Sequence, residues 1–208
     1  MNNILIIADL PKGKSIALSR GIELARSAGA NVTVVAFVYE KLNLLLDQSL
    51  DLDECEVKDI LLSERESQLK ETLKGIDHKG VNVERVIVWE KHVAKWVINN
   101  CKQHAYDVII KVRHASESIL YTSTDWQLLR ECSAPVLLVA EKKWRKSRSI
   151  LATVDLGSKS KAKQRLNKKI LDIASALSQQ LGMSLHLVSV VPVSPLLRDL
   201  DLIDVGES

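Results

Sequence analysis

Basic and hydroxyl-bearing side chains lie on the two sides of one loop near the middle of the chain. The candidates are Lys111, Arg113, His114, Thr122, Ser123 and Thr124. The first three follow or end a short apolar run, and the last three precede a segment with a helical pattern. Cationic side chains and the free N–H groups at the start of a helix both bind anions. These residues therefore predict a site for a small anionic metabolite.

The same residues also allow a purely structural interpretation. In that case Lys111 pairs with Asp9 or Asp125, and the Thr/Ser run caps the helix that follows. Asp9 directly follows the first apolar run of the chain. The sequence leaves both interpretations open, with Asp9 as a further candidate for the site.

Cysteine and histidine residues show no pattern typical of a catalytic or metal site. The three cysteines, Cys55, Cys101 and Cys132, have no CxxC spacing, and their odd number argues against a disulfide framework. Cys101 and His104 share a helical face, but a packed cysteine beside a surface histidine explains that spacing. The chain also lacks an HExxH motif and a nucleophile elbow. We therefore predict no catalytic residue, no metal and no cofactor.

Short β-branched runs alternate with helical patterns in the first two thirds of the chain. Strands are predicted over residues 4–8, 32–38, 81–89, 107–111 and 136–140. Helices are predicted over about 15–28, over a longer stretch that ends near Gly80, over 93–101, and from an N-cap at Thr124 to Arg130. Connections of this length give parallel strands with helices on both faces. The predicted fold class is α/β, a doubly wound, flavodoxin- or Rossmann-like sheet of five parallel strands.

The beginning of this pattern recurs later in the chain. Residues 150–156 resemble residues 4–10 at an offset of 146, and Gly182 follows a second helical stripe as Gly29 follows the first. A further strand-like run then covers 185–191. We therefore predict a domain over 1–141, a basic linker over 142–149, and a partial second copy over 150–208 with strand–helix–strand order.

Four short segments carry a resemblance to a known family. Residues 111–114, 121–126, 128–130 and 135–136 read KVRH, YTSTDW, LLR and PV. With these segments the chain resembles the universal stress protein family, and within it the tandem, type E members. The resemblance implies the sheet order 3-2-1-4-5, bacterial stress physiology, a cytoplasmic location, no established catalytic chemistry, and pairing of domains through their last strands. That order places the ligand crevice between strands one and four, beside Asp9 and Lys111.

The resemblance also implies where nucleotide-binding members carry glycines, and this chain departs from them. Val112 and Ala115 stand at the first two glycine positions, and Thr122-Ser123 stands at the last pair. Glycine lets backbone N–H groups approach phosphates closely. We therefore expect a degenerate nucleotide site in a non-enzymatic stress-response sensor or interaction scaffold. The alternative is an ATP-dependent switch or weak nucleotide hydrolase of the same fold.

Composition limits the partners that the chain is expected to have. A net charge of +3 over 208 residues does not by itself imply nucleic acid, although the basic segment 142–148 leaves an RNA-associated stress protein as a second alternative. No run approaches the roughly 20 apolar residues of a membrane span, so we expect a cytoplasmic protein without a membrane partner. The strand from Val136 to Ala140 is uncharged and is expected at a sheet edge, which predicts a homodimer through it.

Overall fold

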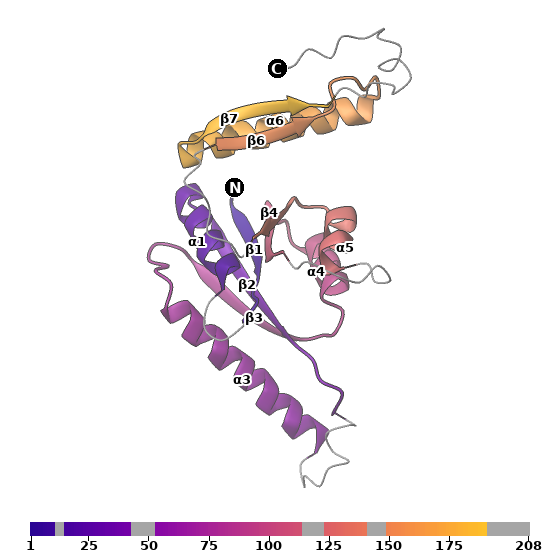
Figure 1. The fold of residues 1–208 in the computed structure, drawn as a ribbon. Helices are drawn as coiled ribbons and strands as arrows, with labels where there is room; N and C mark the ends of the chain where they lie inside the picture. Colours follow the sequence, from indigo (N-terminus) through magenta and orange to yellow (C-terminus); the bar gives the residue numbers. More distant parts are fainter. Residues whose placement is uncertain (11–14, 43–52, 114–122, 141–148, 191–208) are drawn as a thin grey trace. The chain divides into compact units, whose positions relative to one another are not determined.

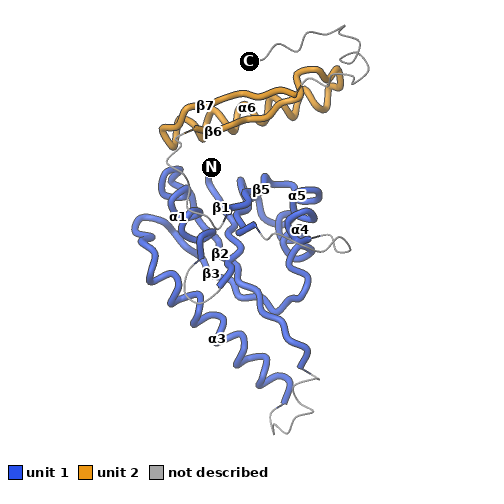
Figure 2. The backbone as a smooth tube through the Cα atoms, in the orientation of Figure 1, with its two compact units in different colours: residues 1–143 blue, residues 144–208 orange. Residues whose placement is uncertain are grey.

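The structure is a computed structural model that describes residues 1–10, 15–42, 53–113, 123–140 and 149–190. The chain divides into two compact units, residues 1–143 and 144–208 (Figure 2). The first unit contains a five-stranded sheet and the second a two-stranded sheet. The division falls within the segment predicted to be a basic linker.

Five parallel strands form the sheet of the first unit, and the predicted fold class is confirmed. The strands are β1 (Asn3–Ile7), β2 (Asn31–Val38), β3 (Val83–Trp89), β4 (Val108–Val112) and β5 (Val136–Val139). Their order is β3-β2-β1-β4-β5, as the family resemblance implied. Every residue of β4 is buried, and in the central strand, β1, the side chains of Ile4, Leu5 and Ile6 are fully shielded from solvent. A continuous apolar strand of this kind requires cover on both faces.

Helices supply that cover (Figure 1). α1 (Ile16–Ala28) and α3 (Glu54–Lys74) lie on one face, and α4 (Val93–Gln103) and α5 (Thr124–Glu131) lie on the other. Ser15 caps α1 by accepting a hydrogen bond from the Leu18 N–H, and Gly29 ends the helix in the left-handed conformation. Because each helix runs back along the sheet, the loops after β1 and β4 meet at one end of it.

Two helix ends differ from their predicted positions. α3 ends at Lys74, not near Gly80, because Gly75 is a poor helix former and the Asp77 carboxylate accepts a hydrogen bond from the Lys79 N–H in a local turn. α5 is capped by Ser123 and not by Thr124, which is the first residue of the helix. Serine and threonine are similar caps, so the residue types could not distinguish the two positions.

The second unit has the predicted strand–helix–strand order. It consists of β6 (Ser149–Val154), α6 (Lys161–Leu181) and β7 (Ser184–Ser189), with the two strands parallel. Gly182 ends α6 in the left-handed conformation with φ 60°, and Gly29 ends α1 with φ 65°. The matching helix ends agree with the repeat read from the sequence.

Candidate functional site

A hollow of about 430 Å³ lies at the carboxyl ends of β1 and β4. Asp9 enters it from the loop after β1, Lys111 from β4, and Ser123 and Thr124 from the start of α5. The structure therefore brings four of the predicted site residues together. The apolar part of the wall is formed by Ile7, Ala8, Leu10, Phe37 and Val93.

Lys111 is held in this hollow by a buried ion pair. Its Nζ lies 3.0 Å from Oδ1 of Asp125, and both residues are almost fully buried. The same Nζ donates a hydrogen bond to the Val112 carbonyl at 2.8 Å. The ammonium charge is thus already offset by a carboxylate. Together with the Ser123 cap, this geometry matches the structural interpretation of these residues.

The remaining predicted residues are not all placed at the hollow. Arg113 is exposed and is not part of its lining, although its N–H continues the sheet by donating to the Val139 carbonyl at 2.8 Å. His114 and Thr122 lie outside the described residues, as does Ala115. For these three residues the prediction stays a prediction.

Arg65 is a lining residue that the sequence reasoning missed. It lies on α3 one helical turn before Leu69, which is fully buried, and Leu73 continues the same stripe. Residues four apart share a helix face, so the spacing of Arg65 with the two buried leucines could have indicated from the sequence that Arg65 faces the sheet. Its guanidinium donates to the Gln68 side chain at 3.3 Å. Arg65 thus adds a second cation to the lining.

The lining carries balanced formal charge. Asp9 and Asp125 contribute two carboxylates, and Arg65 and Lys111 contribute two cations. Because Lys111 is already paired with Asp125, Arg65 and the start of α5 are the groups best able to attract an anion. The hollow is therefore suited to a small polar ligand more than to a highly charged polyphosphate.

Cys101 and Cys132 lie away from this hollow and are poor nucleophiles. Cys101 lies on the buried side of α4, and burial raises the pKa of its thiol. Burial also raises the pKa of the neighbouring Cys132 thiol to about 12. Both side chains therefore stay protonated at neutral pH, where only a thiolate would react readily. Within the described residues no group of His, Cys, Asp or Glu is arranged to hold a metal ion.

Residues 1–140 match the universal stress protein family. The chain belongs to that family. Among curated relatives, Universal stress protein E of Salmonella typhi and that of Escherichia coli K12 are each 27% identical over 202 residues. Each alignment covers 93% of this chain and 63% of the relative. The chain therefore spans less than two thirds of the length of these relatives.

Solved structures share the fold. A functionally unknown protein from Pseudomonas aeruginosa PAO1 superposes with a TM-score of 0.64 at 21% identity, covering 97% of this chain and 65% of that one. A putative universal stress protein from Pseudomonas aeruginosa UCBPP-PA14 gives 0.57 at 22% identity, with the same coverage. No helix among the described residues is long and apolar enough to cross a membrane.

Proposed function

We propose that this universal stress protein is a non-enzymatic stress-response sensor or interaction scaffold whose nucleotide site is degenerate. The observation that carries the proposal is the buried Lys111–Asp125 pair in the hollow after β1 and β4. A lysine that is neutralised within the protein contributes little to binding a polyphosphate. Val112, at a position where nucleotide-binding members are expected to carry glycine, is itself buried and carries a branched side chain.

Titration calorimetry with Mg-ATP tests this proposal. We expect no heat of binding from the wild-type chain. The variant Asp9→Ala is the matched control, since Asp9 lines the hollow without belonging to the buried pair. A low-micromolar dissociation constant that is lost in Asp9→Ala would contradict the proposal and favour the ATP-dependent switch or hydrolase.

The ligand that best suits the hollow is a small anionic metabolite. Its volume of about 430 Å³ lies in the range of known small-molecule pockets. Arg65 supplies a cation, and the start of α5 supplies a positive helix end. Inorganic phosphate is a suitable test anion, and its binding should weaken in Arg65→Gln but persist in the exposed-site variant Lys74→Gln. Equal binding by both variants would place the anion elsewhere.

Membership of the universal stress protein family also suggests how the chain assembles. We take the two units as tandem domains, the second one partial, in a cytoplasmic protein that forms a homodimer through the strand at 136–140. Support comes from the position of β5, which lies at the end of the sheet order and pairs with β4. Light scattering should give a dimer, and Leu138→Pro should disrupt it by removing a backbone donor. The basic segment 142–148, on which the RNA-associated alternative depends, lies outside the described residues.

A further inference from the structure

A dense group of basic side chains lies at the start of α6, over residues 159–169, and is called here the basic end of α6. It contains six cations and no carboxylate: Lys159, Lys161, Lys163, Arg165, Lys168 and Lys169. All six residues are exposed. The Nζ of Lys163 lies 2.9 Å from Oδ2 of Asp155, and none of the other five cations forms an ion pair with a described residue. Five positive charges therefore face solvent without a carboxylate partner in the described part of the chain.

The basic end of α6 is additional to what the packing of the second unit requires. α6 has 21 residues, whereas α1, its counterpart in the first unit, has 13. When the two helices are matched at the glycines that end them, Gly182 and Gly29, residues 161–168 have no equivalent in α1. Residues 161–166 are all exposed, while the part of α6 around the buried Ala174 packs on the strands. Packing therefore explains the second half of α6 but not its first two turns.

The placement of these cations is unfavourable for the helix itself. The N-terminal end of a helix carries partial positive charge, so acidic residues stabilise it and basic residues do not. α3 follows this rule, with Asp53 as its N-cap and Glu56 completing a capping box. α6 has no acidic residue in its first turn, and Lys161 and Arg165 are like charges four residues apart. A polyanionic partner would compensate both effects.

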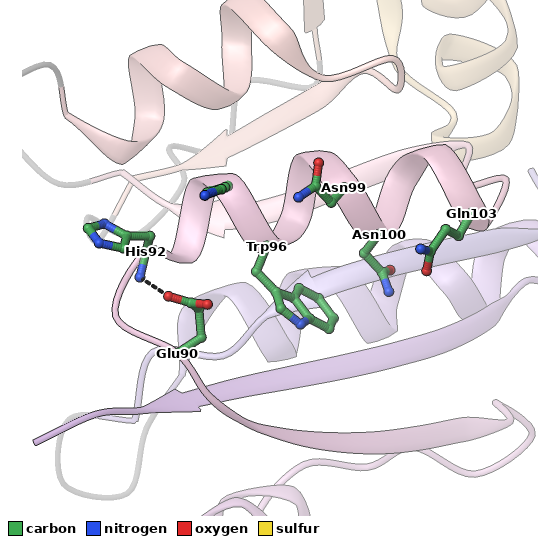
Figure 3. A pocket seen from close by; sticks show the side chains of 7 residues that line it. Glu90, His92, Trp96, Asn99, Asn100 and Gln103 are labelled. Carbon is green, nitrogen blue, oxygen red and sulfur yellow. Dashed lines mark hydrogen bonds between the residues drawn. The ribbon is translucent and has the colours of Figure 1, made fainter.

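Elsewhere on the described surface, acidic side chains lie among the basic ones. On α3 the Nζ of Lys70 lies 2.8 Å from Oε1 of Glu66. A hollow of about 250 Å³ beside α4 is lined by Glu90 as well as Lys95, and the Glu90 carboxylate accepts a hydrogen bond from the His92 N–H at 2.7 Å (Figure 3). The basic end of α6 contains no such carboxylate, so a polyanion meets less repulsion there.

Double-stranded DNA suits this helix better than other polyanions do. Single-stranded nucleic acids are bound largely by stacking on aromatic rings, and residues 155–172 contain none. The major groove of duplex RNA is deep and narrow, whereas that of DNA is about 12 Å wide and admits an α-helix. A helix that lies in a membrane surface needs an apolar exposed face, but Ala162 and Leu166 are the only apolar residues among 159–169.

We propose that the basic end of α6 binds the phosphate backbone of double-stranded DNA, with little dependence on base sequence. From Lys161 to Lys169 the helix rises about 12 Å, which is enough to reach phosphates on both sides of a major groove. Asn167 ties this part of the helix to the loop after β6, because its side chain accepts from the Asp155 N–H at 3.1 Å and donates to the Asp155 carbonyl at 2.8 Å. Contacts to phosphates position a protein on DNA without reading sequence.

This interaction is independent of the function proposed above. It uses the second unit, whereas the anion site lies in the first unit at the carboxyl ends of β1 and β4. It also differs from the RNA-associated alternative in the ligand and in the segment that binds it.

Fluorescence anisotropy of a labelled, mixed-sequence DNA duplex, titrated with the full chain at several salt concentrations, tests the proposal. The logarithm of the association constant should fall with the logarithm of salt concentration with a slope of about −4 to −5, because about five phosphates are neutralised. The triple variant Lys161→Gln/Arg165→Gln/Lys168→Gln should bind about tenfold more weakly or worse, and its slope should be about 3 units less steep.

The control triple variant, Lys79→Gln/Lys91→Gln/Lys102→Gln, removes the same charge from exposed positions of the first unit. It should bind nearly as tightly as the wild type. A second measurement needs no variant: acetylation of the wild-type chain, read by mass spectrometry, should show that the duplex protects Lys161 and Lys168 but not Lys79.

Four results would overturn the proposal. They are no anisotropy change with the duplex at low salt, an α6 triple variant that binds as tightly as the wild type, equal weakening in both triple variants, and tighter binding to single-stranded RNA or to phosphatidylserine vesicles than to the duplex. Circular dichroism reports whether each variant is folded. If one is not, protection of Lys161 and Lys168 in the wild-type chain decides the matter.

Discussion

At the scale of single residues, the Lys111–Asp125 pair is the contact on which the first site depends most. The side chains are 7% and 8% exposed, so each charge relies on the other for compensation. Lys111→Met or Asp125→Leu should lower the free energy of unfolding by about 3–5 kcal/mol, because each leaves the charge of the other residue buried without a partner.

Urea denaturation of the two single variants and of the double variant Lys111→Met/Asp125→Leu measures this coupling. The double variant should recover most of the loss, since two apolar side chains of similar size need no partner. If the loss in free energy of unfolding of the double variant equalled the sum of the losses of the two single variants, the two residues would act independently.

Asp107 joins the start of β1 to the start of β4 and should make stability pH-dependent. Its Oδ2 accepts hydrogen bonds from the backbone N–H groups of Asn2 and Asn3, at 2.5 and 3.0 Å. The bond from Asn2, followed by that from Asn3, lowers the pKa of the carboxyl. A lowered pKa in the folded state means that the contribution is present above the unfolded pKa of about 3.9 and is lost as pH falls through the folded value.

Asp107→Asn should therefore cost on the order of 1 kcal/mol at pH 7, a modest figure because Asp107 is largely exposed. The difference from wild type should shrink as pH falls below about 4. Thermal unfolding at a series of pH values checks this, with Asp59→Asn, which changes an exposed carboxylate of α3, as the control. A difference that is constant over the whole pH range would contradict the assigned hydrogen bonds.

At the scale of elements, α1 packs on the sheet through a glycine. A Cβ placed on Gly21 would lie 2.3 Å from Cδ1 and 2.9 Å from Cγ1 of Ile6, a residue that is fully buried in β1. Gly21→Ala should lower stability by about 1–3 kcal/mol through overpacking. This outweighs the gain of about 1 kcal/mol from the better helix propensity of alanine.

Gly75→Ala is the matched control for that variant. Gly75 has φ −76° and the nearest atom to an added Cβ is the Thr72 carbonyl oxygen at 3.5 Å, an ordinary contact. The Gly75→Ala variant should have a free energy of unfolding close to that of the wild type, measured by urea denaturation. Equal losses for Gly21→Ala and Gly75→Ala would mean that helix geometry, and not packing on Ile6, decides the result.

The elements were largely predictable from local pattern, but the site was less so. Apolar runs such as residues 4–8 marked strands because burial on both faces leaves no room for polar residues. That Asp9 and Lys111 lie at the same hollow could be predicted from the sheet order alone. The end of α3 could not be located because it depends on a turn at Asp77, and Arg65 was missed because its place at the hollow depends on how far α3 extends along the sheet.

At the scale of the whole molecule, the two units differ in how well they bury the same positions. In the first unit Leu5 and Ile7 are 0% and 5% exposed under α4 and α5. At the offset of the repeat, Leu151 of β6 corresponds to Leu5 and is 64% exposed. Val190, just after β7, is 79% exposed. Among residues 149–190 a helix packs on one face of the two strands, and these residues supply no second helix for the other face.

This difference predicts that the two units do not fold equally well alone. A fragment of residues 1–143 should show native circular dichroism and one cooperative urea transition, because its core contains a sheet covered on both faces. A fragment of residues 144–208 should lack a cooperative transition, because a two-stranded sheet with one helix buries too little apolar surface to offset its conformational entropy. The full chain, measured under the same conditions, supplies the reference signal for each unit. A cooperative transition in the second fragment, or an unfolded first fragment, would reverse the assignment of which unit carries the stable core.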